Sequence, residues 1–173
     1  MTDGFAHALR IDAIREGERI DLAAADDERA AIAERLGLKR LDRLEAHATL
    51  TRSGDQVHAE GRLRASLDQA CVVTGEPVAA HIDEAFEVRF VPEPKDAAPD
   101  AEIELAPEDC DTVFHDGATI DLGNAVADSL ALAIDPYPRS AAAEAAGREA
   151  GIMSQEQASP FAVLAKLKGG DAA

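Results

Sequence analysis

The sequence contains no Trp, and aromatic residues make up only 3% of its 173 residues. Much of the 46% hydrophobic content is Ala, so we expect an aliphatic core of modest size. There are two cysteines, Cys71 and Cys110, and no apolar run is long enough for a signal peptide or a membrane span. These shortages favour a soluble cytoplasmic protein.

Recognisable reaction chemistry is also scarce. The sequence has no C-x-x-C pair, no nucleophile elbow and no glycine-rich phosphate loop. Carboxylates do gather near Cys110 and His115, but a calcium loop starting at Asp109 would place Val113 and Ile120 at ligand positions. We therefore predict no catalytic residue, no metal site and no cofactor. An RNA-processing enzyme that uses His115 and Asp116 as acid and base remains the weaker alternative.

The sequence has half as many basic residues as acidic ones, 17 against 34. The net charge is −17, and residues 92–173 hold 16 acidic but only 5 basic side chains, against 18 and 12 in residues 1–91. A surface of this sign repels phosphate backbones and attracts basic proteins. We expect a basic protein surface as partner rather than nucleic acid bound over the whole molecule.

The basic residues that are present cluster between a predicted helix and the strand after it. Local RNA contact is the functional interpretation, whereas a solvated face paired with Asp42 and Glu45 is the structural one. No aromatics are interleaved, so stacking of bases is disfavoured. The candidate RNA-contact residues are Arg35, Lys39, Arg40 and Arg43, with Arg52, Arg62 and Arg64 following on the predicted sheet.

Period-two alternation predicts a three-stranded meander between Leu38 and Phe90, with a turn at Ser53-Gly54-Asp55. Segments 5–14 and 18–22 read as strands that extend it, and a short helix follows Asp26 and ends at Gly37. The predicted fold class is α+β, an antiparallel β-sheet or partial barrel with a few short helices and a loosely tethered C-terminal helix. Residues 92–99 are expected to form a mobile loop, with a short strand at Ile103 and Leu105.

A capped amphipathic helix is predicted from Asp121, after a turn at 115–117. Asp suits the N-cap, and apolar residues recur at intervals of four up to Ile134, before Pro136 ends the helix. We assign a structural role to this motif, whose main residues are Asp121, Leu122, Gly123, Val126, Pro136 and Pro138.

Two regions follow from this pattern. Residues 1–138 are expected to form one domain, and residues 139–173 a flexible tail with a short helix at 160–168. Ser159 suits a cap and Pro160 the first helical position. The tail helix is a candidate docking peptide for a protein partner, through Phe161, Leu164, Leu167, Lys166 and Lys168. A helix folded back on its own core is the alternative.

Three segments, in this order and spacing, resemble the YceD family of bacterial proteins linked to accumulation of the large-subunit ribosomal RNA. The resemblance extends from about residue 40 onward. The segments are CVVTGEPV at 71–78 with FEVRF at 86–90, IDLGNAVADSL at 120–130 with PYP at 136–138, and SPFAVLAKLK at 159–168.

The resemblance implies a non-enzymatic role in making or maturing the large ribosomal subunit, through a ribosomal protein or the pre-ribosomal particle. An acidic chaperone of one basic ribosomal protein, without RNA contact, is the alternative. Many relatives carry a second cysteine three positions after the first, where this chain has Thr74. A metal or redox role of the paired form is therefore not expected, and Cys71 is expected to pack beside the turn.

Overall fold

The computed structural model describes residues 5–93 and 111–149. The chain divides into two compact units, Met1–Gln69 with Ala79–Pro136 and Ala70–Val78 with Tyr137–Ala173. Each unit is described by itself. The tail residues predicted to dock, Phe161 to Lys168, lie outside the described residues, as do residues 94–99 of the loop expected at 92–99 and the strand expected at Ile103 and Leu105.

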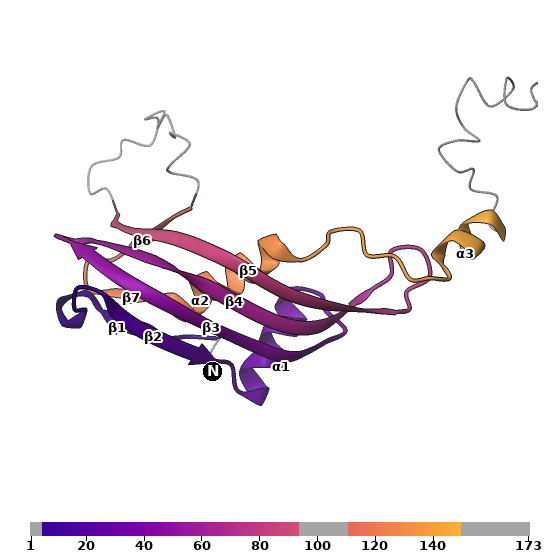
Figure 1. Cartoon of the computed structure of the whole chain (residues 1–173), viewed down its shortest axis with the longest axis horizontal. Helices are drawn as coiled ribbons and strands as arrows, with labels where there is room; N and C mark the ends of the chain where they lie inside the picture. Colours follow the sequence, from indigo (N-terminus) through magenta and orange to yellow (C-terminus); the bar gives the residue numbers. More distant parts are fainter. Residues whose placement is uncertain (1–4, 94–110, 150–173) are drawn as a thin grey trace, which may run out of the picture. The chain divides into compact units, whose positions relative to one another are not determined.

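The first unit is built on a five-stranded sheet in the order β2-β3-β4-β5-β6. Figure 1 shows its long strands side by side. Its strands are β2 (Glu18–Ala23), β3 (Arg40–Ser53), β4 (Gln56–Ala70), β5 (Pro77–Pro92) and β6 (Thr112–His115). The predicted α+β fold with a meander is confirmed, and β2 pairs antiparallel with β3 as expected.

The sheet differs from the prediction at one edge. It does not close into a barrel, and β6 lies parallel to β5, with Arg89 opposite Thr112 and Pro92 opposite His115. Parallel neighbours require a crossover of about a dozen residues or more. The chain between Pro92 and Thr112 is long enough for that crossover. The turn that joins β3 and β4 is too short for one, so these two strands are antiparallel.

The N-terminal segment also departs from expectation. Only Ala8–Arg10 forms a strand (β1), a 3-10 turn (η1) follows at Ile11–Ala13, and β1 pairs with β7 (Thr119–Asp121) in a separate two-stranded sheet. The prediction that residues 5–14 extend the main sheet is therefore wrong. The Ile11 N–H donates to the Ala118 carbonyl at 3.1 Å, so the partner of this segment comes from residues 118–121.

Two helices cover one face of the main sheet. Helix α1 (Asp26–Arg35) begins where the Glu28 carboxylate accepts the Ala25 N–H at 2.7 Å, and it ends before Gly37, whose φ is +65°. Helix α2 (Leu122–Ala133) begins at the predicted N-cap Asp121. The second unit contains α3 (Ala143–Glu149). The core joins sheet and helices through Ile32, Leu44, Leu50, Leu63, Phe90, Leu122, Val126 and Leu130.

Burial alternates along the strands as the sequence pattern predicts. In β3 the buried residues are Leu41, Leu44, Ala46, Ala48 and Leu50, and the residues that alternate with them from Arg43 onward face away from the helices. The same alternation holds for β4 around Leu63. The main sheet therefore has one face on the core and one open face.

Candidate functional site

The open face of the main sheet places charged side chains next to one another on neighbouring strands. Cross-strand partners share a face, so Glu45 on β3 lies beside Arg64 on β4, and His47 lies beside Arg62. Asp21 on β2 lies on the other side of His47, so Asp21, His47 and Arg62 are neighbours across three strands. A shallow hollow of about 300 Å³ is lined by Asp21, Glu45, His47, Arg62 and Arg64.

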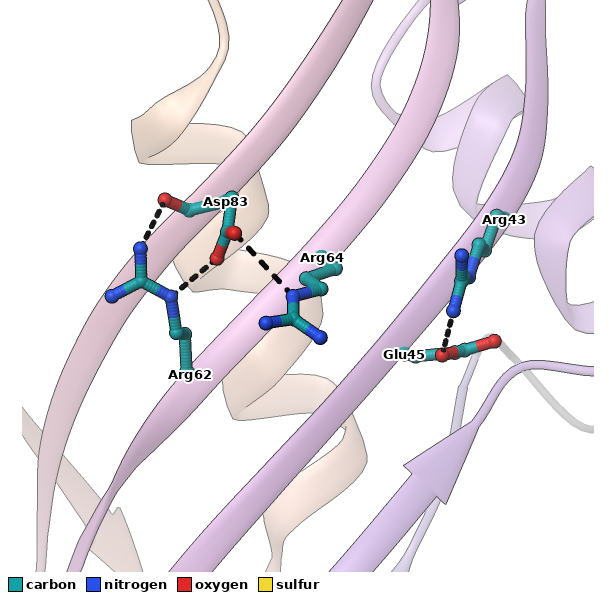
Figure 2. A network of polar contacts seen from close by, with 5 residues as sticks. All are labelled: Arg43, Glu45, Arg62, Arg64 and Asp83. Atoms are coloured by element: carbon teal, nitrogen blue, oxygen red, sulfur yellow. Dashed lines mark hydrogen bonds and ion pairs between the residues drawn. The ribbon is translucent and has the colours of Figure 1, made fainter.

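Asp83 on β5 holds two of these arginines together. One carboxylate oxygen accepts from Arg62 Nε and the other from Arg64 Nε at 3.4 Å, and the Asp83 carbonyl accepts from an Arg62 Nη at 3.1 Å. On β3, Arg43 donates to Glu45 at 2.5 Å. Figure 2 shows both groups on neighbouring strands, with a helix behind the sheet.

These contacts keep the carboxylates ionised. The hydrogen bond from Arg62, and then the charges of Arg62 and Arg64, lower the pKa of Asp83. The hydrogen bond from Arg43 likewise lowers the pKa of Glu45. The side chains of Arg62, Arg64 and Asp83 are 46%, 58% and 50% exposed, so the network stays open to a partner in solution.

The four candidate RNA-contact residues are not gathered into one cluster. Arg35 pairs with Asp128 at 3.1 Å, and Arg40 pairs with Asp42 and Asp68 at 3.2 and 3.0 Å. Lys39 is exposed. Arg43 alone joins the network of Figure 2. The pairing with Asp42 and Glu45 that the structural interpretation expected is present.

Arg62 and Arg64 lie on the sheet as predicted, but they are not among the four candidate RNA-contact residues. The signal was available, because two arginines separated by one residue in a strand lie on the same face. What the sequence did not indicate is Asp83, which is about twenty residues away along the chain and becomes their neighbour through the pairing of β4 and β5.

The motif that begins at Asp121 holds the N-terminal segment. Asp121 Oδ1 accepts the N–H groups of Asn124 and His7, each at 3.0 Å, and the Leu122 N–H donates to the His7 carbonyl at 3.1 Å. The predicted N-cap is confirmed. Leu122 and Val126 are fully buried, which accounts for their part in the motif.

The second unit contains a tight turn at Cys71, a residue that is only 3% exposed. The Cys71 thiol accepts the N–H groups of Thr74 at 3.4 Å and Ser140 at 3.3 Å. Hydrogen bonding from the Ser140 backbone, and then from the Thr74 side chain, lowers the pKa of Cys71 to about 6. Glu76 accepts the hydroxyls of Thr74 and Ser140 at 3.1 and 2.9 Å. The expected packing of Cys71 beside the turn is confirmed.

The closing prolines of the motif have different surroundings. Pro138 is buried, and its carbonyl accepts the Val72 N–H at 2.9 Å within the second unit. Pro136 is exposed. Pro138 therefore belongs with the Cys71 turn, whereas Pro136 follows the end of α2.

The acid and base of the alternative enzyme hypothesis have structural partners. His115 is 6% exposed, its Nδ1 accepts the Gly117 N–H at 2.9 Å, and its Nε2 lies 2.9 Å from the Asp55 carbonyl. An Nδ1 that accepts leaves Nε2 as the donor. Asp116 accepts the N–H groups of Ala118 and Thr119, which lower its pKa. Both side chains organise the turn before β7.

Among residues 5–93 and 111–149, no three His, Cys, Asp or Glu side chains lie close enough to hold a metal ion. Asp109 and Cys110 lie outside that range. Within it, no helix has both the length and the apolar character to cross a bilayer.

No curated protein matches the chain, and no solved structure does. The model of one protein family, described as Large ribosomal RNA subunit accumulation protein YceD, matches residues 59–168. The match covers well over half of the chain and includes the Cys71 turn, the Asp121 motif and the terminal segment. The chain therefore belongs to the YceD family.

Proposed function

We propose that this protein is a non-enzymatic factor in biogenesis of the large ribosomal subunit. It supports accumulation or maturation of the large-subunit ribosomal RNA through contacts with a ribosomal protein or with the pre-ribosomal particle. Membership of the YceD family is the observation on which this proposal rests. The hydrogen bonds of His115 and Asp116 to the backbone, which serve the turn, favour it over the RNA-processing alternative.

The net charge gives the proposal a physical basis. At −17, the chain is attracted to the basic surfaces of ribosomal proteins, and opposite charge speeds association. The same charge favours a second candidate, an acidic chaperone of one basic ribosomal protein that makes no RNA contact.

The first test is genetic. Deleting the gene should lower large-subunit ribosomal RNA relative to small-subunit RNA, and the full chain should restore it. A His115→Ala and Asp116→Ala double variant that folds should restore it as well, because no step of catalysis is assigned to these residues. Unchanged RNA levels in the deletion strain would contradict the proposed function.

The second test identifies the partner. Mass spectrometry of material that co-purifies at moderate salt should find large-subunit proteins or particles, with less recovered when residues 159–168 are removed. Recovery of a single basic ribosomal protein, free of RNA, would favour the chaperone. Recovery of neither ribosomal protein nor RNA would contradict both candidates.

A further inference from the structure

The open face of the main sheet is balanced in charge although the chain is strongly acidic. Strand alternation and register place six arginines, six carboxylates and three histidines on it. These residues are Arg19, Asp21, Arg40, Arg43, Glu45, His47, His58, Glu60, Arg62, Arg64, Asp68, His81, Asp83, Glu87 and Arg89. With neutral histidines the face has no formal net charge, whereas the whole chain has −17. A polyanion therefore meets less repulsion here than the average surface would give.

Within this face, the network of Figure 2 has an excess of one positive charge, from Arg43, Arg62 and Arg64 against Glu45 and Asp83. A guanidinium has five N–H donors. Arg64 uses only its Nε on Asp83, and Arg43 uses one Nη on Glu45. The described contacts leave the outer donors of both guanidiniums available to a new acceptor.

The carboxylates position the arginines rather than blocking them. Asp83 accepts from Arg62 and Arg64 with different oxygens, so one side chain orients two guanidiniums. Arg62 and Arg64 are two residues apart on β4, which separates their backbones by about 6.6 Å along the strand. Planar forks held side by side suit the oxygens of successive phosphates, which guanidinium binds in a bidentate way.

We propose that this open face binds the phosphate backbone of single-stranded ribosomal RNA, with Arg62, Arg64 and Arg43 as the contact residues. The inference rests on the proposed function, because the family description supplies ribosomal RNA as the polyanion. An acidic polypeptide is the other polyanion to consider, since its carboxylates also bind guanidinium in a bidentate way, but the family description names ribosomal RNA.

The chemistry of the face sets the kind of binding. Strands β3 and β4 contain no Phe, Tyr or Trp, so bases find no aromatic side chain to stack on there. Contacts to phosphate position a nucleic acid without reading its sequence. Binding is therefore salt-dependent and independent of RNA sequence. Selectivity for ribosomal RNA has to come from other contacts within the particle.

The test compares two double charge reversals in the full-length protein. Arg62→Glu with Arg64→Glu changes the proposed face, and Arg10→Glu with Arg35→Glu makes the same change in net charge at arginines outside that face. The probe is a mixed-sequence single-stranded RNA of about 12 nucleotides, within the length that one small domain covers. Fluorescence anisotropy measures Kd from about 50 to about 200 mM salt.

The wild-type protein should bind this RNA, and the Arg62/Arg64 variant should bind at least about tenfold more weakly, whereas the Arg10/Arg35 variant should stay within about threefold. The salt slope of the Arg62/Arg64 variant should be shallower by about 1.4, the value for two lost phosphate contacts on a single strand. Arg62→Gln with Arg64→Gln replaces the reversal if that variant does not fold, as judged by its thermal unfolding.

Three results would overturn the proposal. The first is that the wild-type protein does not bind the RNA, and the second is that the two double variants lose the same amount of RNA affinity. The third is that the wild-type protein binds a polyglutamate peptide as tightly as the RNA, which would identify the face as a site for acidic polypeptide. The gene-deletion experiment and the binding experiment test different claims. Unchanged ribosomal RNA levels after gene deletion would contradict the proposed function without changing the measured affinities. Absence of RNA binding by this face would leave the effect of gene deletion on ribosomal RNA levels unchanged.

Discussion

Gly123 shows how a single residue can decide whether two segments meet. A Cβ atom at this position would lie 2.2 Å from the Phe5 carbonyl oxygen and 2.9 Å from the His7 nitrogen. Gly123→Ala should lower the free energy of unfolding by about 1–3 kcal/mol, because backbone has to move. Gly147→Ala is the matched control, since no atom beyond its chain neighbours and the backbone of its own helix lies within 4 Å of its Cβ position, and Ala is the better helix former by about 1 kcal/mol. Equal effects of the two substitutions in denaturant unfolding would contradict this steric explanation.

Cys71 gives a prediction on pH. Its pKa is lowered to about 6 from an ordinary value of 9.0, so the native state favours the thiolate. That stabilisation is complete above pH 9.0 and is lost as the pH falls toward about 6. In a Cys110→Ser background, the ultraviolet absorbance of the thiolate should titrate near pH 6.

The same titration distinguishes the two donors of Ser140. Ser140→Ala keeps the backbone N–H that reaches Cys71 at 3.3 Å and should change the midpoint little. Ser140→Pro removes this N–H and should raise the midpoint toward the ordinary pKa of a thiol. A midpoint that shifts equally in both variants would assign the effect to the hydroxyl.

At the scale of elements, Asp121 joins the start of α2 to the N-terminal segment. Asp121→Ala removes the cap and leaves the His7 N–H without its acceptor, which should cost about 1–3 kcal/mol. Hydrogen exchange should therefore speed up in β1 and in the first turn of α2, and should change little in the centres of β3 and β4. Asp121→Asn, which keeps the accepting oxygen, is the control. Uniform acceleration over the whole sheet would contradict a local role.

For the whole molecule, the dominant quantity is the net charge of −17, which opposes compaction through self-repulsion. Salt screens this repulsion over about 10 Å at about 0.1 M. Tm should therefore rise as NaCl increases from a few millimolar to that concentration. Removing two exposed carboxylates, by Glu60→Gln with Glu84→Gln, should raise Tm more at low salt than at high salt. A fall in Tm with salt would mean that the surface ion pairs outweigh the repulsion.

The elements that sequence predicted well are those with a local cause. The alternation of β3 and β4, the turn at Gly54 and the N-cap at Asp121 each depend on residues within a few positions of one another. The assignment of residues 5–14 to the main sheet is wrong because the hydrogen-bond acceptors of that segment, at Ala118 and Asp121, are more than a hundred residues away along the chain. Strand β6 escaped prediction because its pairing with β5 requires a crossover.

The sequence by itself determined the charge, the strand pattern, the capped helix and the family resemblance, since all of these follow from composition and short spacings. Only the tertiary structure decided which face of the sheet stays open, that Asp83 joins Arg62 and Arg64, and that Arg35 and Arg40 are held in other ion pairs. The physical reason is that strand pairing and helix packing bring distant residues within hydrogen-bonding distance, and periodicity along the chain carries no information about which distant residues these are.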